Sequence, residues 1–385
     1  MILAPKEVCS GCTACQSVCR QKAIAMVADA EGFLYPKIDE AICVHCGMCE
    51  KVCPSLNRDV SRVPLAVYAA RANDDELRLK SSSGGVFSLL ARRIIARGGV
   101  VYGAGFDHED WRVKHMPVEN EDGLANLRGS KYVQSDIRGV FADVKSKLLS
   151  GCQVMFSGTP CQIAGLKHYL KASNIDAARL FLVDVVCHAV PSPLAWQKYL
   201  DERLVEDGLG TAIRRISFRR KSCGWKRYSM SLCFADGNEY LRDLRIDSFL
   251  RGFLSGLYNR PSCHVCQCRE LRSGSDMTIA DYWRVNEKFP AMDDDRGTSL
   301  LLVNTEVGEM LIREIVSDLS IVKSDYSDAV RVNPSLVSSG APHRKRSSFF
   351  KKVNCCTFDH LVESLLKRSL WRRIASRIKR MVVRR

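Results

Sequence analysis

The sequence predicts an α/β domain that follows a small cysteine-rich module and precedes a basic amphipathic helix. Eight of the 18 cysteines fall before residue 57. From residue 64 onward, short apolar runs alternate with longer segments of helical periodicity, as in α/β domains. The end of the chain, from His343, carries fourteen Lys/Arg and only two acids. We therefore expect three parts, at residues 1–57, 64–340 and 341–385.

The elements of the α/β part follow from the position of apolar residues. Short apolar runs, which suit buried strands, lie at 66–72, 100–106, 152–158, 179–187 and 277–283. Helical periodicity predicts a helix within 84–99, which glycines open and close, and a helix within 136–151, which a glycine ends. Residues 211–260 mix short strands and turns. The polar segment 55–64, which ends in proline, is predicted to be a linker.

Composition excludes several classes of protein. A hydrophobic content of 46% and an aromatic content of 8% are typical of a globular chain and not of a disordered one. No apolar run approaches the ~18–20 residues of a membrane-spanning helix. No basic-then-apolar leader precedes Cys9. In such a chain many cysteines indicate metal or redox chemistry rather than disulfides, so we expect a cytoplasmic protein.

The first 57 residues contain the spacing C-x2-C-x2-C-x3-C twice. Soft thiolates select iron–sulfur clusters or zinc, and zinc sites usually pair two C-x2-C knuckles instead. In the two-cluster arrangement the fourth cysteine of each motif binds the cluster of the other motif. The predicted ligand sets are Cys9, Cys12, Cys15 and Cys53 for the first 4Fe–4S cluster, and Cys43, Cys46, Cys49 and Cys19 for the second. The segment resembles the bacterial two-cluster ferredoxin module, with Arg20 where that family usually has proline and Pro54 in place.

A third group of cysteines lies in the α/β part. Two of them, Cys161 and Cys187, follow predicted strands, and ligands of open α/β sheets gather at the carboxyl ends of strands. A C-x2-C pair at Cys263 and Cys266 completes four ligands for a third cluster, with Cys268 as a substitute. The alternative is that these are small buried apolar side chains. That interpretation is kept for Cys152, Cys223, Cys233, Cys355 and Cys356.

Several segments together are similar to the family of beta subunits of coenzyme F420-reducing hydrogenases and dehydrogenases, which also includes flavin-dependent reductases of chlorophyll derivatives. The segments are "KSSSGGVFSLLA", "GSKYVQS", "SGTPCQIAGLK", "VDVVCHAVPSP", "RPSCHVCQC" and "SDMTIADYW", in the family's order across about residues 64–335. The resemblance implies a domain that binds FAD and one 4Fe–4S cluster, with Cys161, Cys187, Cys263 and Cys266 as ligands.

The predicted flavin site begins at the turn "SSSGG", where small residues open a helix and leave backbone N–H groups accessible. An ordinary helix capped by these serines is the alternative. The candidate cofactor contacts are Lys80, Ser83, Gly84, Gly85, Ser130, Lys131, Tyr132, Ser135, Thr159 and Asp281. Lysines there favour the anionic reduced flavin, although each taken alone is typical of a solvated surface. No catalytic residue is assigned; His168, His188 and Asp184 are candidate proton donors.

These features predict an iron–sulfur flavoprotein oxidoreductase. It would take single electrons from a ferredoxin-like donor through 4Fe–4S clusters to FAD and reduce a small organic substrate, such as a deazaflavin or a surface-polysaccharide precursor. The alternative is a non-catalytic electron-transfer subunit of a larger hydrogenase or dehydrogenase complex.

The C-terminal segment has apolar residues at Leu366, Leu370, Ile374, Ile378 and Val382, with nine Lys/Arg mostly on the other side. This pattern is typical of a helix that lies on an anionic membrane surface, at the inner face of the cell membrane here. Docking on its own body or on a partner is the second interpretation. Nucleic-acid binding is the third, although no nucleic-acid module accompanies the charge.

Overall fold

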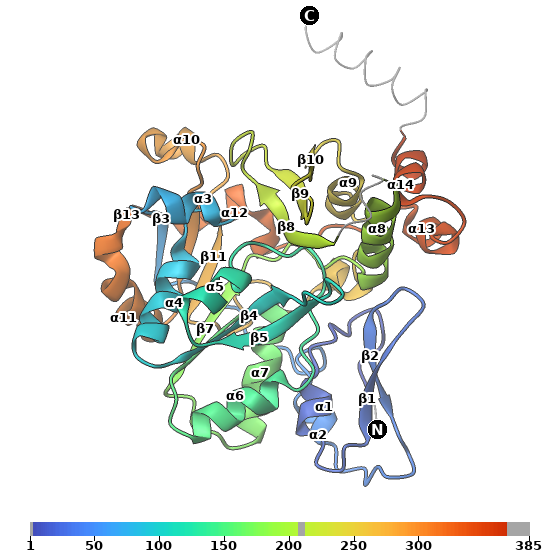
Figure 1. Ribbon diagram of the computed structural model, residues 1–385. Helices are drawn as coiled ribbons and strands as arrows, with labels where there is room; N and C mark the ends of the chain where they lie inside the picture. Colours follow the sequence, from blue (N-terminus) through green and yellow to red (C-terminus); the bar gives the residue numbers. More distant parts are fainter. Residues whose placement is uncertain (1–2, 207–211, 368–385) are drawn as a thin grey trace, which may run out of the picture.

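The computed structural model describes residues 3–206 and 212–367, and its centre is an eight-stranded mixed sheet (Figure 1). The strand order is β13 (Leu319–Ser324), β3 (Ala66–Ala72), β12 (Ser299–Val303), β11 (Met277–Asp281), β7 (Leu180–Val185), β6 (Val154–Gly158), β4 (Val100–Phe106) and β5 (Val113–Val118). Strands β11, β7, β6 and β4 run parallel. The flanking pairs are antiparallel. The α/β fold expected from the sequence is therefore present.

The five expected strands are all found, because apolar runs suit strands that are covered on both faces. The predicted ranges 66–72 and 100–106 coincide with β3 and β4. The other three predicted ranges contain β6, β7 and β11. The sequence analysis missed β12, whose "SLLLV" is buried throughout and pairs between β11 and β3.

Helices cover both faces of this sheet. On one face α4 (Val86–Ala96), α5 (Glu121–Leu127) and α11 (Glu306–Ile315) form a common core with the strands. The other face is covered by α6 (Val140–Leu149), α7 (Pro160–Ala172), α10 (Val285–Lys288) and α12 (Tyr326–Val332). The predicted helices 84–99 and 136–151 contain α4 and α6, each of which begins after a glycine with positive φ, Gly85 and Gly139. A short helix, α3 (Asp75–Lys80), precedes α4.

A second lobe surrounds a smaller antiparallel sheet. Its strands are β10 (Glu239–Asp243), β9 (Ser229–Phe234) and β8 (Ile213–Arg220). Its helices are α8 (Pro193–Glu206), α9 (Ser248–Leu254), α13 (Arg346–Lys352) and α14 (Phe358–Leu366). An aromatic-rich core joins these elements.

Part of the segment assigned to the basic tail belongs to this lobe. Phe349 of α13 and Phe358 and Leu361 of α14 are buried in its core. The first half of 341–385 therefore packs on the body of the protein. Leu366, the first residue of the predicted amphipathic helix, ends α14, and the other residues of its apolar side lie within 368–385, outside the described residues. Within the described parts of the chain, no helix is long and apolar enough to cross a membrane.

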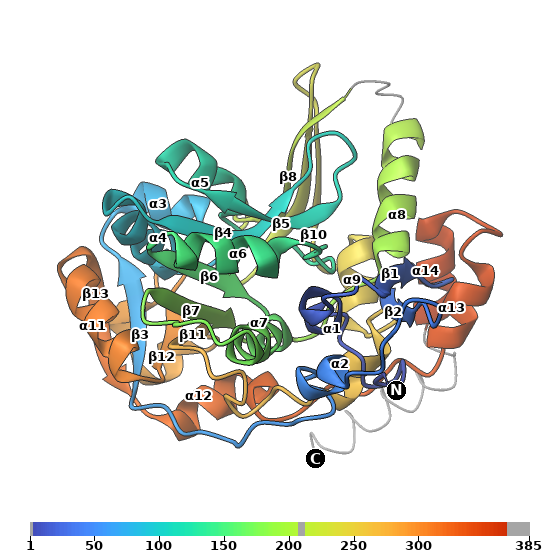
Figure 2. The same cartoon turned by 90° about the horizontal axis from the view of Figure 1, so that it is seen from below.

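The cysteine-rich module consists of the hairpin β1 (Ile24–Ala28) and β2 (Leu34–Ile38) with two short helices, α1 (Ala14–Val18) and α2 (Met48–Lys51). Figure 2 shows α1 beside α7, and Ala14 of α1 is fully buried in the core that α6 and α7 form. The module therefore shares a core with the α/β domain.

One fully buried side chain, Arg260, connects the module to the rest of the chain. Its Nε donates to the carbonyl oxygen of Cys9 at 2.8 Å, and its Nη2 donates to that of Leu34 at 2.9 Å. Its Nη1 donates to Oε1 of Gln134 at 2.8 Å, on the other side of the interface. The guanidinium also lies over the ring of Tyr35, 4.3 Å from the centroid. One cation thus satisfies acceptors from both parts of the structure.

We expect Arg260→Met to loosen the module. The substitution keeps apolar bulk but leaves one buried and two partly buried acceptors without their donor, at a cost of about 3 kcal/mol. Trypsin should then cut the exposed linker at Arg58 and Arg62 faster than in the wild type. Arg112→Met, at an exposed arginine, is the matched control. Equal cleavage rates for Arg260→Met and this control would contradict the bridging role.

Candidate cysteine-lined redox site

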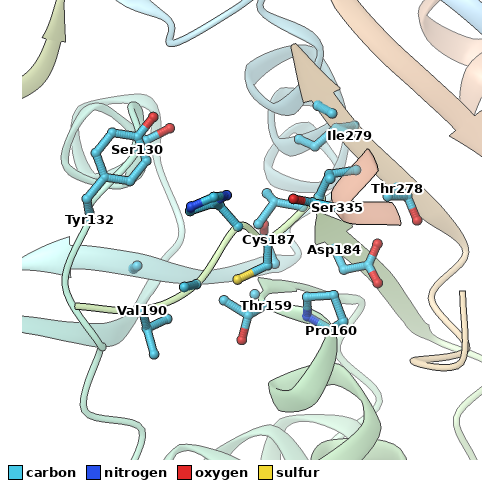
Figure 3. A pocket seen from close by; sticks show the side chains of 18 of the residues that line it. Ser130, Tyr132, Thr159, Pro160, Asp184, Cys187, Val190, Thr278, Ile279 and Ser335 are labelled. Carbon is cyan, nitrogen blue, oxygen red and sulfur yellow. The ribbon is translucent and has the colours of Figure 1, made fainter. Parts of the chain in front are cut away.

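A cavity of about 530 Å³ lies at the carboxyl ends of β6, β7 and β11, between the large sheet and the second lobe. Figure 3 shows Cys187 close to Thr159 and Pro160, with Ser130 and Tyr132 across the cavity. Parallel strands deliver their following loops to one edge, which is where α/β folds bind ligands. The cavity is therefore placed where the sequence analysis expects the third cysteine set.

The four cysteines of the third predicted set all line this cavity. Cys161 lies in the first turn of α7, and Cys187 follows β7 by two residues. Cys263 lies in the 3-10 helix η1 (Pro261–Val265), and Cys266 follows it. Burial, together with the thiols of Cys263, Cys161 and Cys266, holds the pKa of Cys187 well above its usual range. The structure therefore brings these four thiols together.

Cys268, the substitute ligand, is buried beside the same group. Its thiol hydrogen-bonds that of Cys266, which lowers the pKa of Cys266 and raises that of Cys268. The thiols of Cys161 and Cys12 also raise the pKa of Cys268. Cys268 therefore lies between the third set and the first.

The first set is also assembled. Burial raises the pKa of Cys15 to about 12, and the thiols of Cys9 and Cys53 add to this shift. Burial raises the pKa of Cys12 well above its usual range, with contributions from Cys15, Cys53 and Cys161. Since Cys161 belongs to the third set, the first and third sets are neighbours.

A glycine of α7 allows this close approach. A Cβ atom at Gly165 would lie 2.9 Å from Sγ of Cys12 and 3.0 Å from its Cβ. Real Cβ atoms do not approach other atoms this closely, so only glycine lets the Cys12 loop rest on the helix here. Cys161 lies four residues earlier on α7, about one turn away.

The second set lies at the other side of the first. Cys49 is buried, and burial, together with the neighbouring thiol of Cys46, raises its pKa. Cys49 in turn raises the pKa of Cys15. Cys46 is exposed, and Cys43 lies within 4.8 Å of ligand atoms of Glu40 and His45. Cys19, the predicted fourth ligand, follows the last residue of α1.

A chain of hydrogen bonds organises one wall of the cavity. Thr159 donates from its N–H and hydroxyl to Oε1 of Gln162, whose amide donates to the hydroxyl of Ser135. His115 contacts this hydroxyl through Nδ1 at 2.9 Å and the carbonyl of Ser157 through Nε2 at 3.0 Å. A carbonyl only accepts, so Nε2 carries the proton and Nδ1 accepts from Ser135. Two predicted cofactor contacts, Thr159 and Ser135, are thus held in place.

The "SSSGG" turn reaches the cavity in a different way from that expected. No side chain caps α4, and Ser82 instead accepts hydrogen bonds from the N–H and hydroxyl of Ser130. The N–H of Gly84 donates to the hydroxyl of Ser299, and a Cβ there would meet the carbonyl of Ala70 at 2.5 Å. Gly84 is therefore required for packing.

The other candidate contacts divide into two groups. Ser83, Gly85, Ser130, Lys131, Tyr132, Ser135, Thr159 and Asp281 line the cavity. Lys80 does not, because it is exposed and pairs with Glu76 of the same helix. Burial and the nearby Arg128 lower the pKa of Lys131 to about 7. Lys80 is therefore withdrawn from the proposed contacts, and Gly84 is kept only for the shape of the turn.

The three candidate proton donors differ in whether they lie at the cavity. His168 pairs with Asp59 at 2.9 Å and does not line the cavity. His188 lines it, next to Cys187. Asp184 is buried in its wall, where burial raises its pKa to about 6, and the hydroxyl of Ser273 donates to it at 2.5 Å.

Sequence reasoning missed the buried arginines of this region. Arg219, Arg260 and Arg269 all line the cavity and are buried. Arg269 donates to the carbonyls of Cys187 and His188. No local pattern distinguishes these residues from the many surface arginines. Their role becomes visible only from their positions in the fold, with Arg219 in β8 and with Arg260 and Arg269 beside the C-x2-C pair.

Stability should depend on pH through His115. Burial lowers its pKa to about 4, whereas an unfolded histidine titrates near 6.5. The part of the free energy of unfolding that depends on neutral His115 is fully present above pH 6.5 and is lost as the pH falls toward 4. The free energy of unfolding should therefore decrease by about 2 kcal/mol between pH 7.5 and 5. We expect the melting temperature of the wild type to fall more over this interval than that of His115→Gln. His108→Gln, at an exposed histidine, should retain the wild-type dependence, and identical slopes for all three proteins would contradict the assignment.

Comparisons with known proteins agree with the resemblance seen in the sequence. Two family models describe the beta subunits of coenzyme F420 hydrogenase/dehydrogenase. Residues 67–141 match the model of their N-terminal part, and residues 152–329 match the model of their C-terminal part. Residues 8–57 match the 4Fe-4S dicluster domain. The two beta-subunit matches together cover most of the α/β domain.

Individual relatives are distant. The F subunit of the F(420)H(2) dehydrogenase of Methanosarcina mazei is 22% identical over 192 residues, which are 47% of this chain and 53% of that protein. The chain thus spans about half the length of this curated relative. A chain of the F420-reducing [NiFe] hydrogenase complex from Methanosarcina barkeri is 18% identical, with a TM-score of 0.49 over 72% of this chain and 90% of that one. From the family matches, the chain belongs to the family of coenzyme F420 hydrogenase/dehydrogenase beta subunits and carries a 4Fe-4S dicluster domain at its N-terminal end.

Proposed function

We propose that this chain is an iron–sulfur electron-transfer subunit of a larger oxidoreductase complex. The observation that carries the proposal is the order of the three cysteine sets. The thiol of Cys49 in the second set raises the pKa of Cys15 in the first, and the thiol of Cys161 in the third set raises the pKa of Cys12 in the first. The third set opens into the cavity. One chain thus offers a continuous series of metal-binding positions from an exposed edge to an internal pocket.

The cysteines fit iron–sulfur clusters as ligands. Thiols of the first set raise the pKa of Cys15, and thiols of the third set raise that of Cys187, because thiolates so close together repel one another. A bound metal would offset this repulsion, and thiolates favour iron–sulfur clusters. When bound, these clusters would transfer single electrons, and a flavin would exchange them for electron pairs.

We further propose that the cavity holds a flavin. Its volume of about 530 Å³ lies within the ~300–1,000 Å³ of small-molecule pockets. Its wall offers the N-terminal end of α4 at Gly85 and the hydroxyls of Ser130 and Tyr132. Burial lowers the pKa of Lys131 to about 7, and its Nζ donates to the carbonyls of Asn126 and Arg128, so a negative charge on a bound ligand would favour its ammonium form. FAD is the flavin that the family resemblance implies.

A second candidate function is the self-contained reductase that the sequence analysis ranks first. The internal cavity beside the third set favours it, because a small substrate can be reduced there. The matching family and the curated relative are both named as subunits, which favours the electron-transfer role. The two functions differ in whether the purified chain alone turns over a two-electron acceptor.

Two finer parts of the proposal concern partners. A ferredoxin-like donor would approach the second set, where Cys46 and the neighbouring Val44 are exposed. The basic residues of 368–385 would hold the chain at an anionic membrane surface.

Anaerobic purification tests the proposal directly. Three clusters correspond to about twelve irons per chain, and we expect one flavin beside them. Iron, sulfide and flavin are measured chemically and by visible absorbance. About eight irons without flavin would contradict both the third set and the flavin proposal.

Two single variants separate the ligands of the third set. Cys263→Ser should lose about four irons, because a cluster needs all of its thiolates. Cys268→Ser should retain all of them, since Cys268 interacts with Cys266 and faces Cys12. The reverse result would make Cys268 the ligand. Cys152→Ser, at the amino end of β6 and so at the edge of the sheet opposite the cavity, is the control.

Gly165→Ala tests the contact between the first and third sets. The new methyl group would overlap Cys12, and α7 cannot retreat because Ile163 and Leu166 on either side are fully buried. We expect the variant to lose about four irons from the first set while the third set stays loaded. Electron paramagnetic resonance of the reduced protein counts the remaining clusters. Gly340→Ala, where a Cβ meets no atom within 4 Å, is the control, and a fully loaded Gly165→Ala protein would contradict the contact.

A further inference from the structure

Arg219, the penultimate residue of β8, forms part of the cavity wall opposite the large sheet. The residue is 7% exposed, and its Nη1 pairs with Oδ2 of Asp281. The guanidinium carbon lies 4.6 Å from the ring centroid of Tyr228 and 5.4 Å from that of Trp283. Two aromatic rings and a carboxylate therefore hold this cation in one position.

Two nitrogens of this guanidinium remain unused. Its Nε and Nη2 are buried and have no hydrogen-bond partner among the residues that the structure describes. A buried donor without an acceptor is costly, more so when it carries charge. Such donors in the wall of a cavity indicate an acceptor that belongs to the ligand of that cavity.

Asp281 cannot supply the missing acceptor. Its Oδ1 accepts from Nε1 of Trp225 at 2.8 Å, so the carboxylate is fixed between the indole and Arg219. Trp225 itself stacks on Trp283, 5.0 Å between centroids and nearly parallel. The predicted cofactor contact Asp281 is thus a positioning residue for Arg219.

The charge of the cavity wall also favours an anion. It contains the cations Arg128, Arg219, Arg260 and Arg269 and the acids Asp184, Glu270 and Asp281, together with Lys131, whose pKa burial lowers to about 7 so that part of it is neutral. One of these acids, Asp184, has its pKa raised to about 6, so part of it is neutral near neutral pH. Burial lowers the pKa of the cavity histidine His115 to about 4, so it adds little positive charge. The lining as a whole is cationic.

We propose that Arg219 binds an anionic oxygen group, a phosphate or a carboxylate, of a ligand in this cavity. Nε and Nη2 are adjacent donors on one edge of the guanidinium and suit two oxygens of one such group. The anion belongs either to the phosphate chain of a bound flavin or to a second, substrate molecule. The inference rests on the proposed function only for the statement that the cavity holds a redox ligand.

The test uses the full chain with its clusters but without flavin. The variants are Arg219→Gln, Arg219→Lys, which keeps the charge but loses the fork, and Arg219→Gln with Asp281→Asn, which removes the buried pair together. Arg214→Gln, at an exposed arginine of the same strand, is the control. Iron content and circular dichroism establish that each variant is folded. If Arg219→Gln alone does not fold, the double variant takes its place in the binding measurements.

Three probes distinguish the source of the anion: FAD, riboflavin and inorganic pyrophosphate. If Arg219 binds the flavin phosphates, Arg219→Gln weakens FAD binding about tenfold or more and leaves riboflavin unchanged. If it binds a second ligand, FAD binding is unchanged, and pyrophosphate no longer alters the flavin fluorescence as it does in the wild type. Either result supports the proposal. Binding of all three probes equal to that of Arg214→Gln would overturn it.

Failure of the flavin proposal gives a different result. A wild-type chain that binds neither FAD nor riboflavin contradicts the flavin assignment alone. Calorimetric titration with pyrophosphate then tests Arg219 by itself. Binding that the Arg219→Gln change abolishes supports the anion site, and absence of binding to the wild type overturns it.

Discussion

The arrangement of the molecule depends on one buried cation, Arg260. Its three hydrogen bonds reach the Cys9 loop, strand β2 and Gln134. The same residue begins the turn that carries Cys263, whose backbone N–H donates to the carbonyl of Arg260. Because a buried guanidinium is stable only when its donors are satisfied, the module and the C-x2-C turn must come together for either to be complete. Burial of this charge thus couples the position of the first cysteine set to that of the third.

Helix α7 sets the spacing between those two sets. It carries Cys161 in its first turn and Gly165 one turn later, so the thiol of Cys12 packs about 6 Å along the axis from a ligand of the third set. The helix itself is fixed by the capping box of Thr159 and Gln162 and by burial of Leu166 against the sheet. A rigid helix rather than a loop therefore determines the distance over which an electron would move between the sets.

Local patterns in the sequence predict much of this structure. The strand β4 and the cysteine motifs could be identified because hydrophobic burial and C-x2-C spacing are properties of neighbouring residues. The roles of Arg219 and Arg260 could not, because their partners lie more than 60 residues away in the chain. The local pattern of "SSSGG" offers helix capping by its serines as the alternative to a flavin contact, but Ser82 instead bonds Ser130 across 48 residues. The sequence analysis places α14 in the basic amphipathic tail because net charge conceals its apolar face, which buries Phe358 and Leu361.

The two ends of the series of cysteine sets differ in their access to other molecules. At one end Cys46 is exposed, and Val44 beside it is 61% exposed, so another protein can approach within a short distance of the second set. At the other end the third set faces a cavity walled by Tyr132 and Trp283, which only a small molecule can enter. Single electrons can tunnel between proteins, whereas hydride transfer requires direct contact. An exposed end that a protein can reach and an enclosed end that a small ligand can reach therefore suit a chain that passes electrons between a protein and a small redox ligand.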